Sequence, residues 1–99
     1  MEKNGLPKYN ILSHTYKQAA RLGVQVFPSD KPKYKIKVYD ADGLFITYAG
    51  ASGYSDFPHY IESPGQEYAE KRRQLYKIRH EKKRHVKGSR GYYADQLLW

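Results

Sequence analysis

Side chains that could bind phosphate are concentrated in one part of the chain. Residues 68–90 contain ten lysines and arginines against two acidic residues, and this excess equals the net charge of +8 of the whole protein. The rest of the chain carries equal numbers of acidic and basic groups. Like charges crowded along one segment repel each other, and a polyanionic partner would relieve that cost. The distribution therefore predicts a partner rich in phosphate.

The sequence of this basic segment predicts a helix over about residues 64–85, with Ser63 as its cap and Pro64 at its first position. At about 100° per residue, Arg73, Lys77 and Arg84 fall on a face opposite the apolar residues. We interpret this face as a solvent-facing stripe that binds nucleic acid; a merely solvated helix surface has the same pattern. The other candidate contacts lie around the stripe and on the outer face of a hairpin: Lys82, Lys83, Lys87, Arg90, Lys33, Lys35 and Lys37.

Two arginines of the same segment, Arg72 and Arg79, fall among the apolar positions of the helix. An unpaired charge in such a place is costly. We therefore expect both side chains to reach solvent along their aliphatic stems or to form structural ion pairs with Asp56 or Asp95.

The sequence provides little support for catalysis or metal binding. His80 and His85 are five residues apart, which separates them on a helix and makes them poor joint metal ligands. His59 near Asp56 could be oriented as a general base, but no nucleophile or oxyanion site accompanies it. The chain has no cysteine, which excludes disulfides, zinc-finger sites and thiol nucleophiles. We expect a protein that is not an enzyme and that needs no cofactor or metal.

The apolar composition predicts a small domain with a thin core. Leucine, isoleucine, valine and phenylalanine together make up only 19 of the 99 residues, which is close to the composition of disordered chains. Eleven tyrosines compensate, because each ring can bury apolar area while its hydroxyl stays hydrogen-bonded. No apolar run approaches the length of a membrane span, and residues 1–5 do not resemble a secretory signal. We therefore expect a tyrosine-rich intracellular protein with no membrane partner.

Local patterns predict a single α+β domain over residues 13–99, preceded by a flexible arm over residues 1–12. The alternation of lysines with Tyr34, Ile36 and Val38, followed by a turn rich in aspartate, predicts a hairpin over residues 33–49. We expect the long basic helix to pack on the small antiparallel sheet built from this hairpin. The remaining expected elements are a helix over 13–22 capped by Ser13 and stopped by Gly23, a strand over 24–27, a loop over 50–58 and an apolar segment over 92–99 that closes the core.

A series of short motifs gives the chain a resemblance to a known group of proteins. In order, they are Leu22-Gly23-Val24, Pro28-Ser29, Lys33-Tyr34-Lys35, Asp42-Gly43, the run from Gly53 to Phe57, the run from Arg72 to His80, Gly88-Ser89 and Leu97-Leu98-Trp99. This order resembles a family of small basic proteins encoded by large DNA viruses of algae and protists, over roughly residues 13–99. The resemblance implies a virus-encoded, virion-associated protein, and it carries over no catalytic residue.

Two functions fit these observations. The first is a non-enzymatic, largely sequence-independent nucleic-acid-binding protein that packages or organises a genome, with DNA a better candidate than RNA. The alternative is a minor capsid or cement protein whose basic helix contacts acidic surfaces of capsid proteins. In the alternative, the arm over 1–12 and the tail over 92–99 are docking segments. Both functions place the protein in the infected host cell, with a place in the virion.

Overall fold

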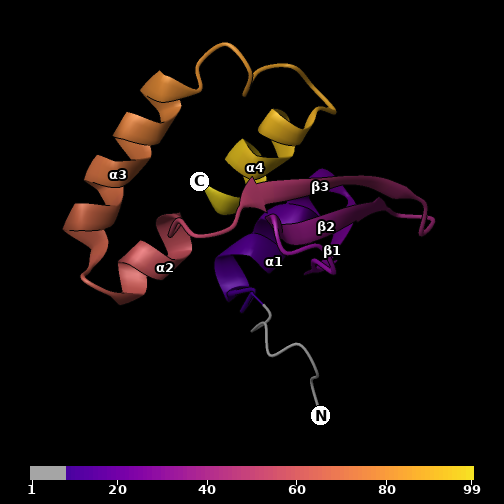
Figure 1. Ribbon diagram of the computed structural model, residues 1–99, viewed down its shortest axis with the longest axis horizontal. Helices are drawn as coiled ribbons and strands as arrows, with labels where there is room; N and C mark the ends of the chain where they lie inside the picture. Colours follow the sequence, from indigo (N-terminus) through magenta and orange to yellow (C-terminus); the bar gives the residue numbers. More distant parts are fainter. Residues whose placement is uncertain (1–8) are drawn as a thin grey trace.

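A computed structural model describes residues 9–99 as an α+β protein, the class that the sequence predicts (Figure 1). Three strands form an antiparallel sheet in the order β1–β2–β3. The elements are α1 (Ser13–Leu22), β1 (Val24–Pro28), β2 (Tyr34–Asp40), β3 (Phe45–Ala51), α2 (Phe57–Glu62), α3 (Gln66–Arg79) and α4 (Arg90–Leu98). Within residues 9–99, no helix has both the length and the apolar character needed to cross a membrane.

The predicted hairpin is confirmed as β2 and β3, and the predicted preceding strand is confirmed as β1. Ile36 lies opposite Ala49, and Val38 lies opposite Val26, so the apolar positions of the three strands share one face of the sheet. In the turn between β2 and β3, the Asp40 carboxylate accepts two backbone N–H bonds of 2.9 Å. Aspartate favours such turns because its side chain satisfies backbone donors that the strands leave free.

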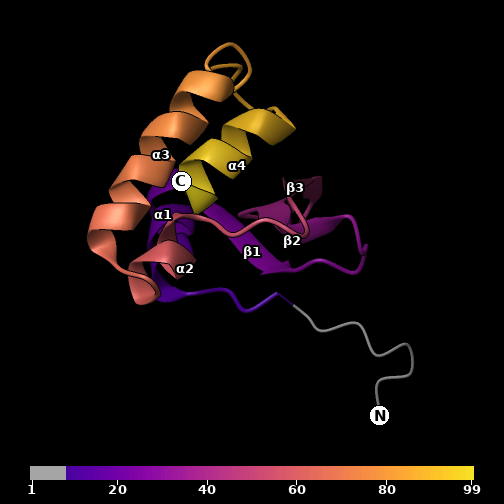
Figure 2. The same cartoon turned by 60° about the vertical axis from the view of Figure 1, so that its left-hand side comes forward.

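Helices α1 and α4 cover the apolar face of the sheet (Figures 1 and 2). Leu97 and Leu98 of α4 are fully buried, and the Thr15 hydroxyl of α1 donates to the Leu97 carbonyl across 2.9 Å. The expectation that the C-terminal segment closes the core is therefore correct. The segment does so as a helix, which Ser89 caps by accepting the backbone N–H of Tyr92. The buried core residues are Ala19, Val26, Ile36, Val38, Ala49, Ala94, Leu97 and Leu98.

Gly50 allows α4 to approach β3 closely. Its φ is +81°, in the left-handed region that favours glycine, and a Cβ at this position would lie 2.6 Å from the Cδ1 of Leu98. A larger residue would push the last turn of α4 away from the sheet. Leu98 can pack as it does only because this position has no side chain.

The first helix has the predicted bounds and the predicted glycine stop, with Gly23 at φ +75°. Ser13 is not its cap: Leu12 occupies the N-cap position, and no side chain accepts a hydrogen bond there. Most of the predicted arm over 1–12 lies outside the described residues. Of its last four residues, Tyr9 and Ile11 pack against the core.

The long basic helix is shorter than predicted and packs mainly on α2, not on the sheet as expected. Residues 66–79 form α3, and residues 80–88 form a series of turns. Ser63 ends α2 instead of capping α3, whose N-cap is Gly65. In a helix continued to residue 85, Lys82 and Lys83 would lie three and four residues after Arg79, the spacing at which like charges repel each other. In the turns, Arg84 instead reaches two carboxylates, at 2.8 Å and 3.8 Å.

Helix α2 occupies the end of the segment that was predicted as a loop. Asp56 caps it by accepting the backbone N–H of His59, and Pro58 sits in the first turn. An aspartate followed within the first turn by proline is a common helix start, so the sequence contained a signal for this helix. The short length of the helix, from Phe57 to Glu62, hid its periodicity.

Helix α3 lies at the edge of the molecule, joined through α2 at one end and through the turns at the other (Figure 1). Ala69 is its one buried residue. Polar contacts and one aromatic stack connect α3 to the last helical segment. Lys77 donates to the Asp95 carboxylate of α4 across 2.7 Å, and the Arg73 guanidinium donates to the Trp99 carbonyl across 3.4 Å. These polar contacts and the stacking of the Tyr76 ring on the Trp99 ring together set the position of α3 relative to α4.

Deleting residues 97–99 should abolish the cooperative unfolding transition, because two fully buried leucines leave the core. The milder Leu98→Ala should lower the free energy of unfolding by about 2–5 kcal/mol. Urea denaturation followed by circular dichroism measures both. Ile78→Ala, at a position that is 74% exposed, is the matched control and should change little. A truncated protein that stays soluble and unfolds cooperatively would show that this segment is not part of the core.

Asp95→Asn should lower the free energy of unfolding by about 2 kcal/mol, because it leaves the partly buried Lys77 without its counter-charge. Double-mutant unfolding with Lys77→Met measures the coupling between the two residues. Asp42→Asn, in the exposed turn of the hairpin, provides a control that removes the same charge. Additive effects of the two changes would show that the pair does not hold α3.

Candidate nucleic-acid interface

A cleft with a volume of about 620 Å³ lies between α3, α4 and the end of the hairpin at which β2 begins and β3 ends. Its lining combines aromatic rings with cationic groups, and none of the described residues that line it is acidic. The lining residues are Tyr34, Lys35, Gly50, Ala51, Tyr54, Ser55, Tyr60, Arg72, Leu75, Tyr76, Arg79, His80, Lys83, Arg90, Gly91, Ala94, Leu98 and Trp99. A recess with this composition can hold an anionic ligand that also carries flat rings.

The aromatic part of the cleft is built around the last residue of the chain. The rings of Tyr76 and Trp99 are stacked, with centroids 4.4 Å apart and planes 9° apart. The ring of Tyr60 lies 6.2 Å from that of Trp99. Tyr54, in the loop before α2, also lines the cleft and is 75% exposed. Planar groups of this kind can stack on nucleic-acid bases.

The cationic part consists of Lys35, which is paired with Asp56, and of four further residues, Arg72, Arg79, Lys83 and Arg90, which we call the cleft cations. None of the four has a carboxylate within 4.0 Å among residues 9–99. The Nε of Arg72 is buried and finds no hydrogen-bond acceptor among the described residues. A buried donor without an acceptor costs free energy, and an anionic ligand in the cleft would supply one.

The assignment of Arg72 and Arg79 as structural ion pairs is therefore wrong. The two aspartates named as their partners are indeed buried and paired, but with other cations. The guanidinium of Arg72 lies over the Tyr60 ring at 5.8 Å, and Arg79 is exposed at the cleft. Cation–π contact partly compensates a guanidinium in such a place without removing its charge.

The predicted solvent-facing stripe is also corrected. Arg73 pairs with Glu70 at 3.0 Å, and its guanidinium stacks on Phe57 at 3.9 Å. Lys77 and Arg84 both reach the Asp95 carboxylate. These three side chains are only 20–33% exposed and hold the helices together. Helical spacing correctly placed Arg72 and Arg79 on one face of α3 and Arg73 and Lys77 on another. The first face lines the cleft and the second forms the structural contacts, which is the reverse of the prediction.

The three lysines predicted on the outer face of the hairpin separate in the structure. Lys35 is buried and donates to Asp56 across 3.0 Å, so it is not available to a partner. Lys37 lies 4.0 Å from Asp30 on the sheet face opposite the core. Lys33 is exposed just before β2. The alternation of lysines with apolar residues predicted that all three lysines face solvent. Lys35 instead points into the interior, where it pairs with Asp56.

Asp56 is the centre of a polar network beneath the cleft. It accepts hydrogen bonds from the Tyr9 hydroxyl at 2.6 Å and from Lys35, and the Nδ1 of His59 lies 2.8 Å away. Burial alone would raise the pKa of Asp56, but the charge of Lys35 and these hydrogen bonds bring it below its ordinary value. The network keeps an ionised carboxylate in the interior and links β2 to the start of α2. The hydrogen-bond partners of the His59 ring within residues 9–99 are Tyr9 and Asp56, and neither is a serine or threonine nucleophile.

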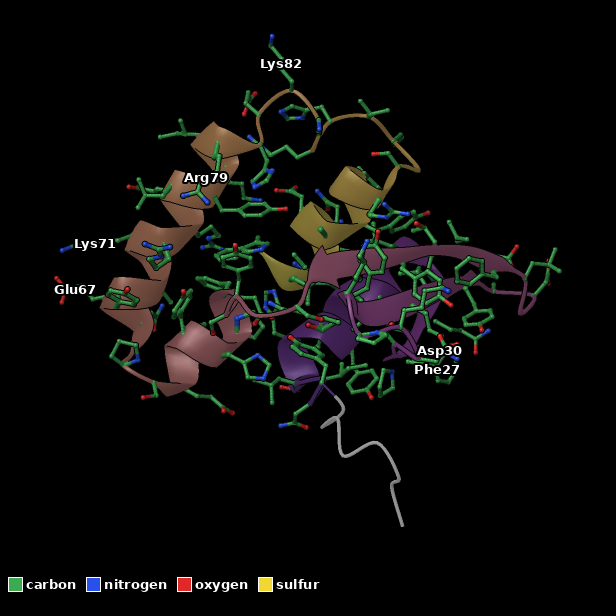
Figure 3. The ribbon with its side chains drawn as sticks, viewed as in Figure 1. Phe27, Asp30, Glu67, Lys71, Arg79 and Lys82 are labelled. Carbon is green, nitrogen blue, oxygen red and sulfur yellow. The ribbon has the colours of Figure 1, made fainter. Side chains whose placement is uncertain are left out.

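The remaining predicted contacts lie in the turns after α3. Lys83 and Arg90 line the cleft, whereas Lys82 and Lys87 are exposed. Figure 3 shows Lys82 and Lys71 pointing away from the rest of the fold. Sequence reasoning missed the aromatic half of the site, which consists of Tyr54, Tyr60, Tyr76 and Trp99. In the sequence these four residues share one signal, an aromatic side chain near a basic segment. That signal does not distinguish rings that pack in the core from rings that line a binding site.

The electrostatics of the cleft favour a neutral histidine and a protonated tyrosine. Burial, Arg79 and Lys83 lower the pKa of His80 below its ordinary value. Burial and the charge of Asp95 raise the pKa of Tyr76 to about 12. At neutral pH the charge of the cleft therefore comes from lysine and arginine alone. No group of three or more potential metal ligands occurs within residues 9–99.

Arg79→Gln should raise the pKa of His80, because it removes a positive charge that opposes protonation of the imidazole. NMR titration of the His80 ring against pH measures this shift. Lys71→Gln, on the outward face of α3, removes the same charge and should leave the midpoint unchanged. Equal shifts in both variants would mean that the net charge of the protein, and not the nearby Arg79, lowers the pKa of His80.

Comparison with known proteins gives no family model, no curated protein and no solved structure that matches this chain.

Proposed function

We propose that the protein binds single-stranded nucleic acid through the cleft between α3 and α4, largely without sequence preference and without catalysis. The observation that carries the proposal is one recess in which the four cleft cations face stacked aromatic rings, with no acidic residue among the described lining. Proteins that bind single strands combine a positive groove for the backbone with aromatic rings for the bases.

The position of the cations supports a single strand over a duplex. Arg72 and Tyr76 lie on the same side of α3 within the recess, not on a protruding face. A duplex keeps its phosphates on a stiff outer surface, whereas a single strand can bend its backbone and turn its bases into a cleft. The Arg72 Nε, buried and without an acceptor among the described residues, is available to a phosphate or base oxygen that enters the recess.

The chemistry of the lining supports weak sequence preference. No asparagine or glutamine is among the described residues that line the cleft, so the bidentate amide contacts that read adenine are not provided. Every base offers a π-face, so stacking on tyrosine and tryptophan discriminates little between them. Binding would then serve packaging or organisation of a genome better than recognition of one site.

The viral context is part of the same proposal and rests on the sequence resemblance. DNA is accordingly the first polymer to test, with RNA as the comparison. The alternative of a capsid cement protein uses the basic helix, the arm over 1–12 and the segment 92–99 to contact capsid proteins, and of these only the segment 92–99 bears on the choice here. That segment belongs to α4, with Leu97 and Leu98 in the core, so it is not available for docking in this fold.

Arg72→Gln combined with Arg79→Gln should weaken binding to an oligothymidylate about tenfold or more at low salt, because the pair supplies half of the cleft cations. Fluorescence anisotropy over a series of salt concentrations measures this. For wild type, log K should fall steeply with log salt. In the double variant the slope should become shallower by about 0.7 for each phosphate that the protein no longer neutralises.

The matched control is Lys71→Gln combined with Lys82→Gln, which removes the same charge from side chains that point away from the fold (Figure 3). It should change binding only slightly. Equal losses of affinity in the two double variants would show a general charge effect and no site in the cleft. A flat salt dependence in wild type would overturn nucleic-acid binding itself.

A further inference from the structure

Five aromatic residues form a continuous row that runs from the outer face of the sheet to the cleft. We call Phe27, Tyr39, Phe45, Tyr48 and Tyr34 the aromatic row. Successive ring centroids along it are 5.5, 5.5, 5.0 and 5.6 Å apart. The row includes one residue of β1, two of β2 and two of β3.

Most of the row lies on the sheet face that the core does not use. Phe27 lies opposite Lys37, and Lys37 lies opposite Tyr48, so all three point away from the core face that carries Val26 and Val38. Phe27 is 44% exposed and Phe45 is 49% exposed. Contiguous exposed apolar surface of this kind marks candidate interaction sites, so we consider what ligand would match its chemistry.

Cations accompany the rings. Lys31 lies over the Tyr48 ring at 5.5 Å, and Lys37 lies over the Tyr39 ring at 5.9 Å. The acidic residue beside them, Asp30, accepts a hydrogen bond from the Tyr48 hydroxyl and lies 4.0 Å from Lys37. With two lysines and one aspartate, this part of the row carries a net positive charge. Rings interleaved with positive charge suit a polymer with flat bases and a phosphate backbone.

The row and the cleft meet at Tyr34 and Arg90. Tyr34 lines the cleft and stacks against Tyr48, with planes 18° apart. Arg90 also lines the cleft; its guanidinium lies over the Tyr34 ring at 4.7 Å and donates to the Tyr48 carbonyl across 3.1 Å. Figure 3 shows Phe27, at the far end of the row, on the opposite side of the molecule from α3. The two surfaces are thus one track across the protein.

We propose that the aromatic row is an extension of the binding site, over which a single strand of nucleic acid continues after it leaves the cleft past Tyr34 and Arg90. The inference rests on the proposed function of the cleft. It adds that the protein binds long strands more tightly than short ones. The row supplies stacking for the additional bases, and Lys31 and Lys37 supply the charge for their phosphates.

The test compares a short oligothymidylate of about four nucleotides with one of about 16, a range that covers the usual site sizes of single-strand binders. Phe27→Leu combined with Phe45→Leu removes two ring faces but keeps apolar side chains, so the fold should be retained. Binding of the long strand should weaken roughly tenfold, and binding of the short strand should not change. Leu44→Ala, a 67% exposed apolar position at the turn of the same hairpin, is the control.

The outcomes separate the extension from the function of the cleft. If wild type binds both lengths equally and the leucine variant has no effect, the extension is overturned while binding in the cleft stands. If the leucine variant weakens the short strand as much as the long one, the row is not an extension but the primary site, and the inference is wrong. If neither length binds wild type, both proposals are overturned. The same double change to alanine, with thermal melting to confirm the fold, should repeat the loss of long-strand affinity.

Discussion

Lys77 of α3 donates to the buried carboxylate of Asp95 in α4 across 2.7 Å, and Arg84 approaches the same carboxylate from the turns that follow α3. Buried ion pairs contribute modestly to net stability, but removing one partner is costly because a desolvated charge remains. The pair therefore fixes geometry more than it adds stability. Without it, α3 would be held to the rest of the domain by α2, by Arg73 and by the stacking of Tyr76 on Trp99.

The same constraint explains why α3 is basic on both sides. One side, with Arg73 and Lys77, neutralises acids and donates to the end of α4. The other side, with Arg72 and Arg79, lines the cleft without carboxylate partners within residues 9–99. The recess lies on this second side, where cations and aromatic rings line the space between α3 and α4.

Sequence patterns predicted the elements whose periodicity is strong. The hairpin and the bounds of α1 follow from alternation and from the glycine at position 23, because these signals act locally. The roles of the cations could not be predicted in this way, since hydropathy assumes that charged faces meet solvent. Lys35, Lys77 and Arg84 meet buried aspartates that lie 11 to 21 residues away in the chain. Only the fold brings such partners together. For this reason the sequence patterns assigned Lys77 and Arg84 to the solvent-facing stripe and Arg72 and Arg79 to ion pairs, the reverse of what the structure has.

Separation of these two sets of cations has a functional consequence. Paired residues such as Lys77 contribute to the fold, so replacing them would disturb structure and binding together. Cleft cations such as Arg79 contribute little to the fold, and their mutual repulsion raises the free energy of the empty cleft. In the proposed function, a phosphate backbone would reduce this repulsion and would offer an acceptor to the buried Nε of Arg72. On this proposal, part of the affinity would come from repulsion among cations that the folded protein brings together, and this is the physical argument for a polyanion as the ligand of the cleft.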